Sequence, residues 1–143
     1  GTHPDGEGAV LGMREAMRET RIEPTDIDYI NMHATSTVQG DISELIAVNR
    51  VFGKRSSLSI SATKSMTGHL LGAAGAIEGI TSIMALKEGI VPPTINTKEI
   101  EPNYAGHYHF PLDKAVKKEM IYAMSNTFGF GGHNACVLFK KIG

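Results

Sequence analysis

The chain has 143 residues, with 14 lysines and arginines against 15 aspartates and glutamates and a formal net charge of -1 at pH 7. This balance leaves no basic field for nucleic acid and no polybasic patch for a membrane surface. Hydrophobic residues make up 41% and charged residues 20%, which is typical of a globular domain with a substantial core. Cys136 is the only cysteine, which excludes an internal disulfide and a cysteine-based zinc site and favours a reducing, cytoplasmic setting.

The first half of the chain alternates helices with short strands. Apolar periodicity, turn residues and runs of β-formers predict, in order, an amphipathic helix over 8–21, a strand over 27–32, a helix over 41–53 and a strand over 58–61. Asp41 is suited to cap the second helix and Gly53 to end it. A break over 23–26 leaves room for one short turn of helix.

The second half opens on an almost wholly apolar segment, Leu70–Leu86, whose spacing predicts a helix buried on most sides. The rest predicts an extended segment over 91–94, a surface loop over 96–111, a solvated basic cluster of Lys114, Lys117 and Lys118, a strand over 120–124, a glycine-rich loop over 125–132 and a strand over 135–139. The alternation predicts a layered α/β fold with parallel strands, in which the last two strands pair antiparallel.

Chemistry-bearing residues follow three of the predicted strands. His33 comes directly after the first strand, Lys64 and His69 follow the second, and the glycine-rich loop follows the third. Because ligands bind at the carboxyl ends of the strands in a parallel sheet, these residues are expected on one edge. His69 also precedes an apolar helix, whose N-terminus disfavours imidazolium. The loop's glycines would let a ligand approach backbone N–H groups and form an oxyanion hole.

Glu78 is the one charge within the apolar helix. A buried carboxylate needs a partner, and Lys64 is the nearest candidate in sequence. The alternative is that Glu78 lies on an exposed stripe beside Thr81 and Ser82, and the sequence leaves both readings open.

Three ordered motifs resemble a known family. Asn31-Met32-His33-Ala34-Thr35-Ser36-Thr37 with Gly40-Asp41-Ile42-Ser43-Glu44 is similar to the first histidine motif of β-ketoacyl-acyl carrier protein synthases. The segment 64–75 resembles their second histidine motif, and 125–134 resembles their C-terminal glycine-rich loop. The resemblance covers nearly the whole chain and is strongest to the type II elongating synthases, which have the thiolase fold. Initiating synthases carry asparagine where this chain has His69.

The resemblance implies roles for the site residues. His33 and His69 would be the histidine pair that stabilises the enolate of a decarboxylating malonyl group, and Lys64 would support them. Phe130 would be a gate whose N–H helps to form the oxyanion hole. The remaining assignments are substrate contacts by Thr35, Thr37, Gly129 and Gly131 and structural support by Glu78 and Asn134. The resemblance implies no cofactor and no metal, because the substrates are carried on the phosphopantetheine of acyl carrier protein.

The sequence also departs from the family pattern. The family nucleophile is a cysteine at a strand-to-helix elbow, and this chain has none there. Cys136 lies between Ala135 and Val137 in a predicted strand, where a small buried hydrophobe is expected instead of a nucleophile. His133 stands where the family usually has threonine.

The expected fold is the C-terminal half of a thiolase-like enzyme, formed by residues 1–143 as one domain. It is expected to have layered α/β/α architecture, with a mixed five-stranded sheet that lacks its first strand here. Since that strand lies centrally in the family, we expect a gap in the sheet, an uncovered apolar helix and an aggregation-prone isolated chain. The expected partners are acyl carrier protein and a second copy in the full-length enzyme. The alternatives are a non-catalytic chain-length factor and a polyketide ketosynthase domain.

Overall fold

The computed structural model describes residues 6–32, 38–62, 74–94, 104–112, 114–128 and 134–142; for 38–42, 74–78, 128, 134 and 135 it describes the backbone alone. The helical elements are α1 (Glu7–Thr20), the 3₁₀ turn η1 (Pro24–Asp26), α2 (Val38–Phe52) and α4 (Ala74–Glu88). The strands are β1 (Tyr29–Asn31), β2 (Ser59–Ser61), β3 (Ile90–Val91), β4 (Val116–Lys117), β5 (Tyr122–Phe128) and β6 (Asn134–Lys140).

The main sheet is mixed and has the order β2-β1-β5-β6. Strands β2, β1 and β5 are parallel, and β6 runs antiparallel to β5 over seven paired residues. The predicted topology is therefore confirmed. The expected central gap is wrong, because β1 pairs directly with β5, with Tyr29 opposite Ala123. This pairing satisfies backbone groups that a gap would have left open.

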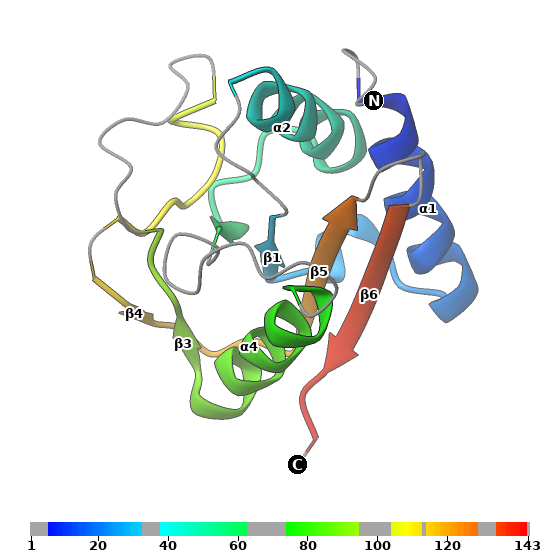
Figure 1. Cartoon of the computed structure of the whole chain (residues 1–143). Coiled ribbons are helices and arrows are strands. Elements are labelled where there is room, and N and C mark those ends of the chain that lie inside the picture. The colour runs from blue at the N-terminus through cyan, green and yellow to red at the C-terminus, as the bar shows by residue number, and fades with distance from the viewer. Residues whose placement is uncertain are drawn as a thin grey trace.

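Helices cover both faces of this sheet, as predicted (Figure 1). Helices α1 and α2 pack against each other and, with Ile30, Ile60 and Met124, form the larger core cluster. Helix α4 packs on the opposite face, where Ala85 and Leu86 contact a smaller cluster around Tyr29. Successive strand residues point to opposite faces, so Tyr29 and Ile30 enter different clusters. The layered α/β/α arrangement follows from this alternation.

Helix α1 forms because apolar residues recur on one face. Val10, Met13 and Met17 are buried, whereas Arg14 and Arg18 on the other face are exposed. Its cap residue Gly6 has a φ of 72°, and a Cβ there would lie 2.6 Å from the Ser43 carbonyl oxygen and 2.9 Å from the Cβ of Ala47. Glycine therefore allows the start of α1 to approach α2 closely.

The described side chains of helix α4 are buried on one face and exposed on the other. Ser82, Ala85 and Leu86 are buried, but Ile80, Ile83 and Met84 are 61%, 47% and 47% exposed. The prediction of burial on most sides is therefore wrong for this chain, and the predicted uncovered apolar surface is confirmed. A contiguous apolar surface of this kind favours association. Aggregation of the isolated chain stays a prediction.

Several element boundaries differ from those predicted. Helix α2 begins at Val38 instead of Asp41, because one side-chain cap contributes only about 1 kcal/mol and a further helical turn can outweigh it. Strand β5 continues to Phe128, so the first residues of the expected glycine-rich loop belong to the strand. The paired register with β6 explains the extension, because each of these residues finds a backbone partner.

The segment expected to be a surface loop over 96–111 is partly built into the sheet. Its described part lies along β2, where His109 N–H donates to the Leu58 carbonyl at 2.9 Å and Ile60 N–H donates to the His109 carbonyl at 2.9 Å. Tyr108 is 4% exposed and its hydroxyl lies 3.2 Å from Asn49 Oδ1 on α2. The weak periodicity of the segment hid this role, because a single bridged residue gives no strand pattern.

The prediction that Lys118 belongs to a solvated basic cluster is wrong. Lys114 and Lys117 are exposed, but Lys118 Nζ donates to the Asp28 carbonyl at 2.9 Å, to the Ser57 carbonyl and to Ser59 Oγ at 2.9 Å. The Asp28 carboxylate in turn accepts from the Ile121 and Tyr122 N–H groups at 2.7 and 3.2 Å. Lys118 therefore ties together the amino ends of β1 and β2.

His109 extends this network. Its Nδ1 lies 2.7 Å from Ser59 Oγ, the oxygen that accepts from Lys118. Because a hydroxyl has one hydrogen and two lone pairs, Ser59 Oγ can accept from Lys118 and also pair with Nδ1 of a neutral imidazole, as acceptor or donor according to the tautomer. Burial, with a smaller contribution from the Lys118 charge, lowers the pKa of His109 below its ordinary value of 6.5.

We expect segment 104–112 to loosen on acidification. A histidine whose pKa is lowered by folding stabilises the native state fully above its unfolded pKa, and this contribution is lost as the pH falls below about 6.5 toward the folded pKa. Hydrogen exchange of the 104–112 peptide in the full-length gene product, at pH 7.5 and 5.5 and corrected for intrinsic rates, measures the effect. Protection should fall at pH 5.5 in the native protein and much less in His109→Gln. Equal losses in both proteins would show that another group titrates.

Candidate functional site

The candidate site is the carboxyl edge of the three parallel strands. Asn31 ends β1, Ser61 ends β2, and Ser125 lies opposite Asn31 in β5. These three residues share one register and are all buried. The prediction that the three strand ends meet on one edge is confirmed.

The predicted catalytic residues follow these strand ends along the chain. His33 comes two residues after Asn31, Lys64 three residues after Ser61, and the glycine-rich segment starts directly after Phe128. The residues that lie outside the described part of the structure are His33, Thr35, Thr37, Lys64, His69, Gly129, Phe130, Gly131 and His133. The structure thus brings together the strands that carry them, and their side-chain roles stay predictions.

Two predicted supporting residues fall within described elements. Glu78 lies in α4, and Asn134 is the first residue of β6, opposite Phe128. For both, the structure describes the backbone alone. The contact between Glu78 and Lys64 therefore stays a prediction. The alternative, an exposed stripe beside Thr81 and Ser82, is wrong for Ser82, which is buried.

Polar side chains that the sequence analysis did not single out form the floor of this edge. Tyr29 Oη lies 2.6 Å from Ser61 Oγ and 3.2 Å from Asn31 Nδ2. Ser125 Oγ is buried and has no hydrogen-bond partner among the described residues. The signal was present in the sequence as a polar residue within one position of the end of each predicted strand (Asn31, Ser61 and Ser125), where an interior strand would ordinarily carry an apolar one.

Thr94 binds the backbone at Ala62, the residue that follows the end of β2. Its Oγ1 accepts a hydrogen bond from the Ala62 N–H at 2.8 Å, and its own N–H donates to the Pro111 carbonyl at 3.0 Å. The extended Pro92-Pro93-Thr94 segment therefore fixes the backbone just after Ser61. The two prolines predicted the extension, but nothing in the sequence indicated which strand it would meet.

Asn126 is buried on the opposite face of β5. Its Nδ2 lies 3.6 Å from Met13 Sδ in α1, and its Oδ1 has no partner among the described residues. The glycine-rich loop predicted over 125–132 would contain this asparagine, but the structure makes it part of β5. It therefore supports the strand that leads into the glycine-rich segment.

Cys136 packs against the larger core cluster from β6, opposite Asn126. Burial, with a smaller contribution from the Glu44 charge, raises the pKa of its thiol to about 12. A thiol with this pKa is protonated at neutral pH and is a poor nucleophile. The packing of Cys136 against the core agrees with its interpretation as a small core residue instead of a nucleophile.

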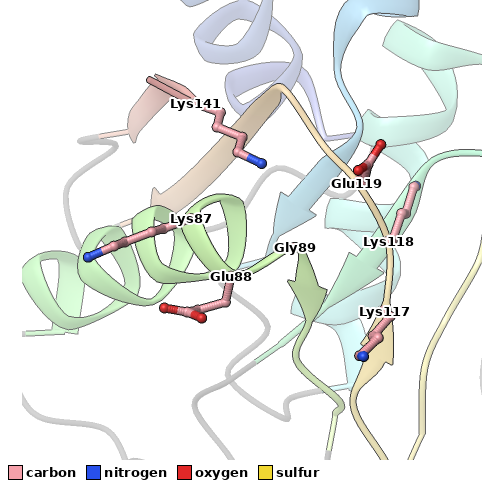
Figure 2. A pocket seen from close by; sticks show the side chains of 7 residues that line it. All are labelled: Lys87, Glu88, Gly89, Lys117, Lys118, Glu119 and Lys141. Carbon is pink, nitrogen blue, oxygen red and sulfur yellow. The ribbon is translucent and has the colours of Figure 1, made fainter. Parts of the chain in front are cut away.

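A surface hollow of about 430 Å³ lies away from the candidate site (Figure 2). It is lined by the C-terminal end of α4, the segment before β5 and the residue that follows β6, with charged side chains around it: Lys87, Glu88, Lys117, Lys118, Glu119 and Lys141. These segments adjoin the amino ends of the parallel strands. The hollow and the candidate site are therefore at opposite ends of the sheet.

The described helices include none that is long and apolar enough to cross a membrane. Among the described residues, no group of three or more histidine, cysteine, aspartate or glutamate side chains is arranged to hold a metal ion.

Known proteins resemble this chain in sequence and in fold. The mitochondrial 3-oxoacyl-[acyl-carrier-protein] synthase of Arabidopsis thaliana is 48% identical over 96% of the chain, and 3-oxoacyl-[acyl-carrier-protein] synthase 2 of Staphylococcus aureus is 45% identical over 97%. The chain spans 30% and 33% of these relatives, about a third of their length. A solved complex of a type II polyketide acyl-carrier protein with its ketosynthase also matches. The match covers 99% of this chain and 34% of the matched chain, with a TM-score of 0.90 and 28% sequence identity.

The family itself is shown by a match that extends over most of the chain. The model described as "Beta-ketoacyl synthase, C-terminal domain" matches residues 1–98, a range that contains both histidine motifs and the first two strands of the candidate edge. The fold agrees, since ketosynthase structures match nearly every residue. The chain therefore belongs to the β-ketoacyl synthase family, and its residues 1–98 match the C-terminal domain of that family.

Proposed function

We propose that this chain supplies the histidine pair and the oxyanion loop of an elongating 3-oxoacyl-[acyl-carrier-protein] synthase of fatty acid biosynthesis. The observation that carries the proposal is the meeting of β2, β1 and β5 at one edge, with Asn31, Ser61 and Ser125 in a single register. The segments with the two histidine motifs and the glycine-rich loop leave from this edge. The names of the relatives from Arabidopsis thaliana and Staphylococcus aureus support the same activity.

The proposed reaction is a decarboxylative Claisen condensation. An acyl group is held as a thioester on a cysteine outside this chain. The bond between the malonyl α-carbon and its carboxylate breaks, CO₂ leaves, and the electron pair moves into an enolate. The enolate carbon attacks the acyl carbonyl carbon, and the collapsing tetrahedral intermediate expels the cysteine thiolate.

His33 and His69 stabilise the enolate by donating hydrogen bonds to the malonyl thioester oxygen as negative charge develops there. In this proposal Lys64 supports the pair, and the Phe130 N–H donates to the oxyanion of the tetrahedral intermediate. Thr35, Thr37, Gly129 and Gly131 line the path of the phosphopantetheine arm. No metal or cofactor takes part in this chemistry.

Acyl carrier protein is the proposed partner, and a homodimer is the proposed assembly of the full-length enzyme. Support for the carrier protein comes from the names of the relatives and from the matched complex of a ketosynthase with its acyl-carrier protein. The homodimer rests on the family resemblance. A cytoplasmic location belongs to the same proposal. It is supported by the single cysteine of the chain, since disulfides are typical of oxidising compartments and one cysteine forms no internal disulfide.

The test is CO₂ release and chain elongation by the full-length gene product, given radiolabelled malonyl-acyl carrier protein and an acyl-acyl carrier protein. We expect both activities. A folded protein that releases no CO₂ would overturn the proposal. A protein that is inactive alone, but stimulates a separate ketosynthase, would instead be a chain-length factor.

A further inference from the structure

Three buried polar side chains form a continuous chain beneath α4. Asn31 Nδ2 lies 3.2 Å from Tyr29 Oη, which lies 2.6 Å from Ser61 Oγ. All three residues are at most 1% exposed. Tyr29 packs in the cluster formed with α4, and Asn31 shares its face because it is two residues further along the strand.

The Tyr29 hydroxyl joins the two ends of this chain. An amide nitrogen donates only, so Tyr29 Oη accepts from Asn31 Nδ2. Between Tyr29 Oη and Ser61 Oγ, either hydroxyl can be the donor. Connected hydrogen bonds polarise one another, whichever of these two hydroxyls donates.

An apolar row would hold this face of the sheet at a lower desolvation cost. Burying hydroxyl and amide groups is unfavourable unless they are hydrogen-bonded, and even then an apolar replacement of the same shape can be as stable. The polar chain ends on the last residue of each strand, Asn31 and Ser61. Those residues precede His33 by two positions and Lys64 by three.

We propose that the chain Asn31–Tyr29–Ser61 sets the position of the end of β1 relative to the end of β2, and so positions His33 relative to Lys64. Tyr29 and Ser61 are then positioning residues, which act through the segments that follow them. The Met32 N–H, which donates to the Ser61 carbonyl at 2.9 Å, links the same two ends through the backbone. The inference rests on the proposed function of His33 and Lys64.

The test uses Tyr29→Phe, Ser61→Ala and the double variant in the full-length gene product. We expect Tyr29→Phe to lower kcat for malonyl-acyl carrier protein decarboxylation about tenfold, since a displacement of about 1 Å can cost up to about a hundredfold in rate. KM and the rate of acyl loading should stay within about twofold, because neither depends on the alignment of this pair. Because both variants break one chain, the double variant should be no slower than the slower single variant.

Tyr108→Phe is the matched control. It also removes a buried tyrosine hydroxyl that is hydrogen-bonded to a neutral side chain, Asn49, but away from the carboxyl edge. It should lower the melting temperature about as much as Tyr29→Phe and leave decarboxylation within about twofold, as expected for a change away from the reacting groups.

Two outcomes would overturn the inference: equal kinetics of Tyr29→Phe and Tyr108→Phe, or a double variant whose loss is the product of the single losses. Either outcome is read only against an active unsubstituted protein. If the unsubstituted protein releases no CO₂, the proposed function itself fails, so the two failures are distinguishable.

Discussion

His33→Ala or His69→Ala should lower the rate of malonyl decarboxylation by the full-length gene product about 10² to 10⁴-fold, the scale of a lost acid–base group or a lost donor to a developing oxyanion. Each histidine is proposed to donate to the same enolate oxygen, so removal of either leaves charge that one donor alone must stabilise. Release of radiolabelled CO₂ from malonyl-acyl carrier protein is the measurement. Acyl transfer to the nucleophile should fall much less, because no enolate forms in that step.

His107→Ala is the control for this experiment. His107 is also a partly buried histidine, and its Nδ1 lies 3.2 Å from Asn49 Oδ1, next to Tyr108 and away from the carboxyl edge. Its replacement should leave decarboxylation within about threefold, as for substitutions away from a site. Near-normal decarboxylation in His33→Ala or His69→Ala would remove that histidine from the site.

The elements with strong local periodicity could be predicted from the sequence. Helix α1 follows its apolar stripe of Val10, Met13 and Met17, and β6 follows its run of β-formers. The edge carrying the candidate site could also be predicted, because parallel strands with short connections place their carboxyl ends together.

Boundaries and side-chain networks could not be predicted, because they depend on partners distant in the chain. Ser125 and Asn126 look like loop residues beside several glycines, and only pairing with β6 makes them part of a strand. Tyr108 is buried in the core, where its hydroxyl donates a hydrogen bond to Asn49, 59 positions away in the chain. Local sequence propensity predicts neither the strand pairing nor this contact.

The direct pairing of β1 with β5 shows where an expectation taken from the family fails. The resemblance predicted a gap where a strand precedes α1 in the family, but β1 and β5 are paired directly in the chain as it stands. A gap would leave a row of N–H and C=O groups unpaired at about 1–3 kcal/mol each, so direct pairing is the better solution for these residues. The exposed side of α4, in contrast, agrees with the expectation of an uncovered helix, because Ile80, Ile83 and Met84 stay about half exposed.

Lys118 is the residue whose role differs most from its sequence context, and its removal should have the largest effect on stability. Its ammonium donates to the Asp28 and Ser57 carbonyls and to Ser59 Oγ. Lys118→Met keeps much of the side-chain volume but leaves all three acceptors without this donor. Since hydrogen bonds to charged groups contribute about 1.5–3 kcal/mol each and partial exposure allows water to replace some of them, we expect a loss of about 2–3 kcal/mol in the free energy of unfolding.

Lys117→Met is the matched control, because the neighbouring lysine is exposed. Its replacement should change the free energy of unfolding by less than about 0.5 kcal/mol, as for most surface substitutions. Urea unfolding of the full-length gene product measures the stability of the two variants. A separate hydrogen-exchange experiment on the native proteins compares protection in β2. Lys118→Met should lose protection first in the segment from Ser57 to Ser61, because two acceptors in that segment lose their ammonium donor at once. Equal stability of the two variants would mean that water replaces the ammonium at no cost and that the amino ends of β1 and β2 are held by backbone pairing alone.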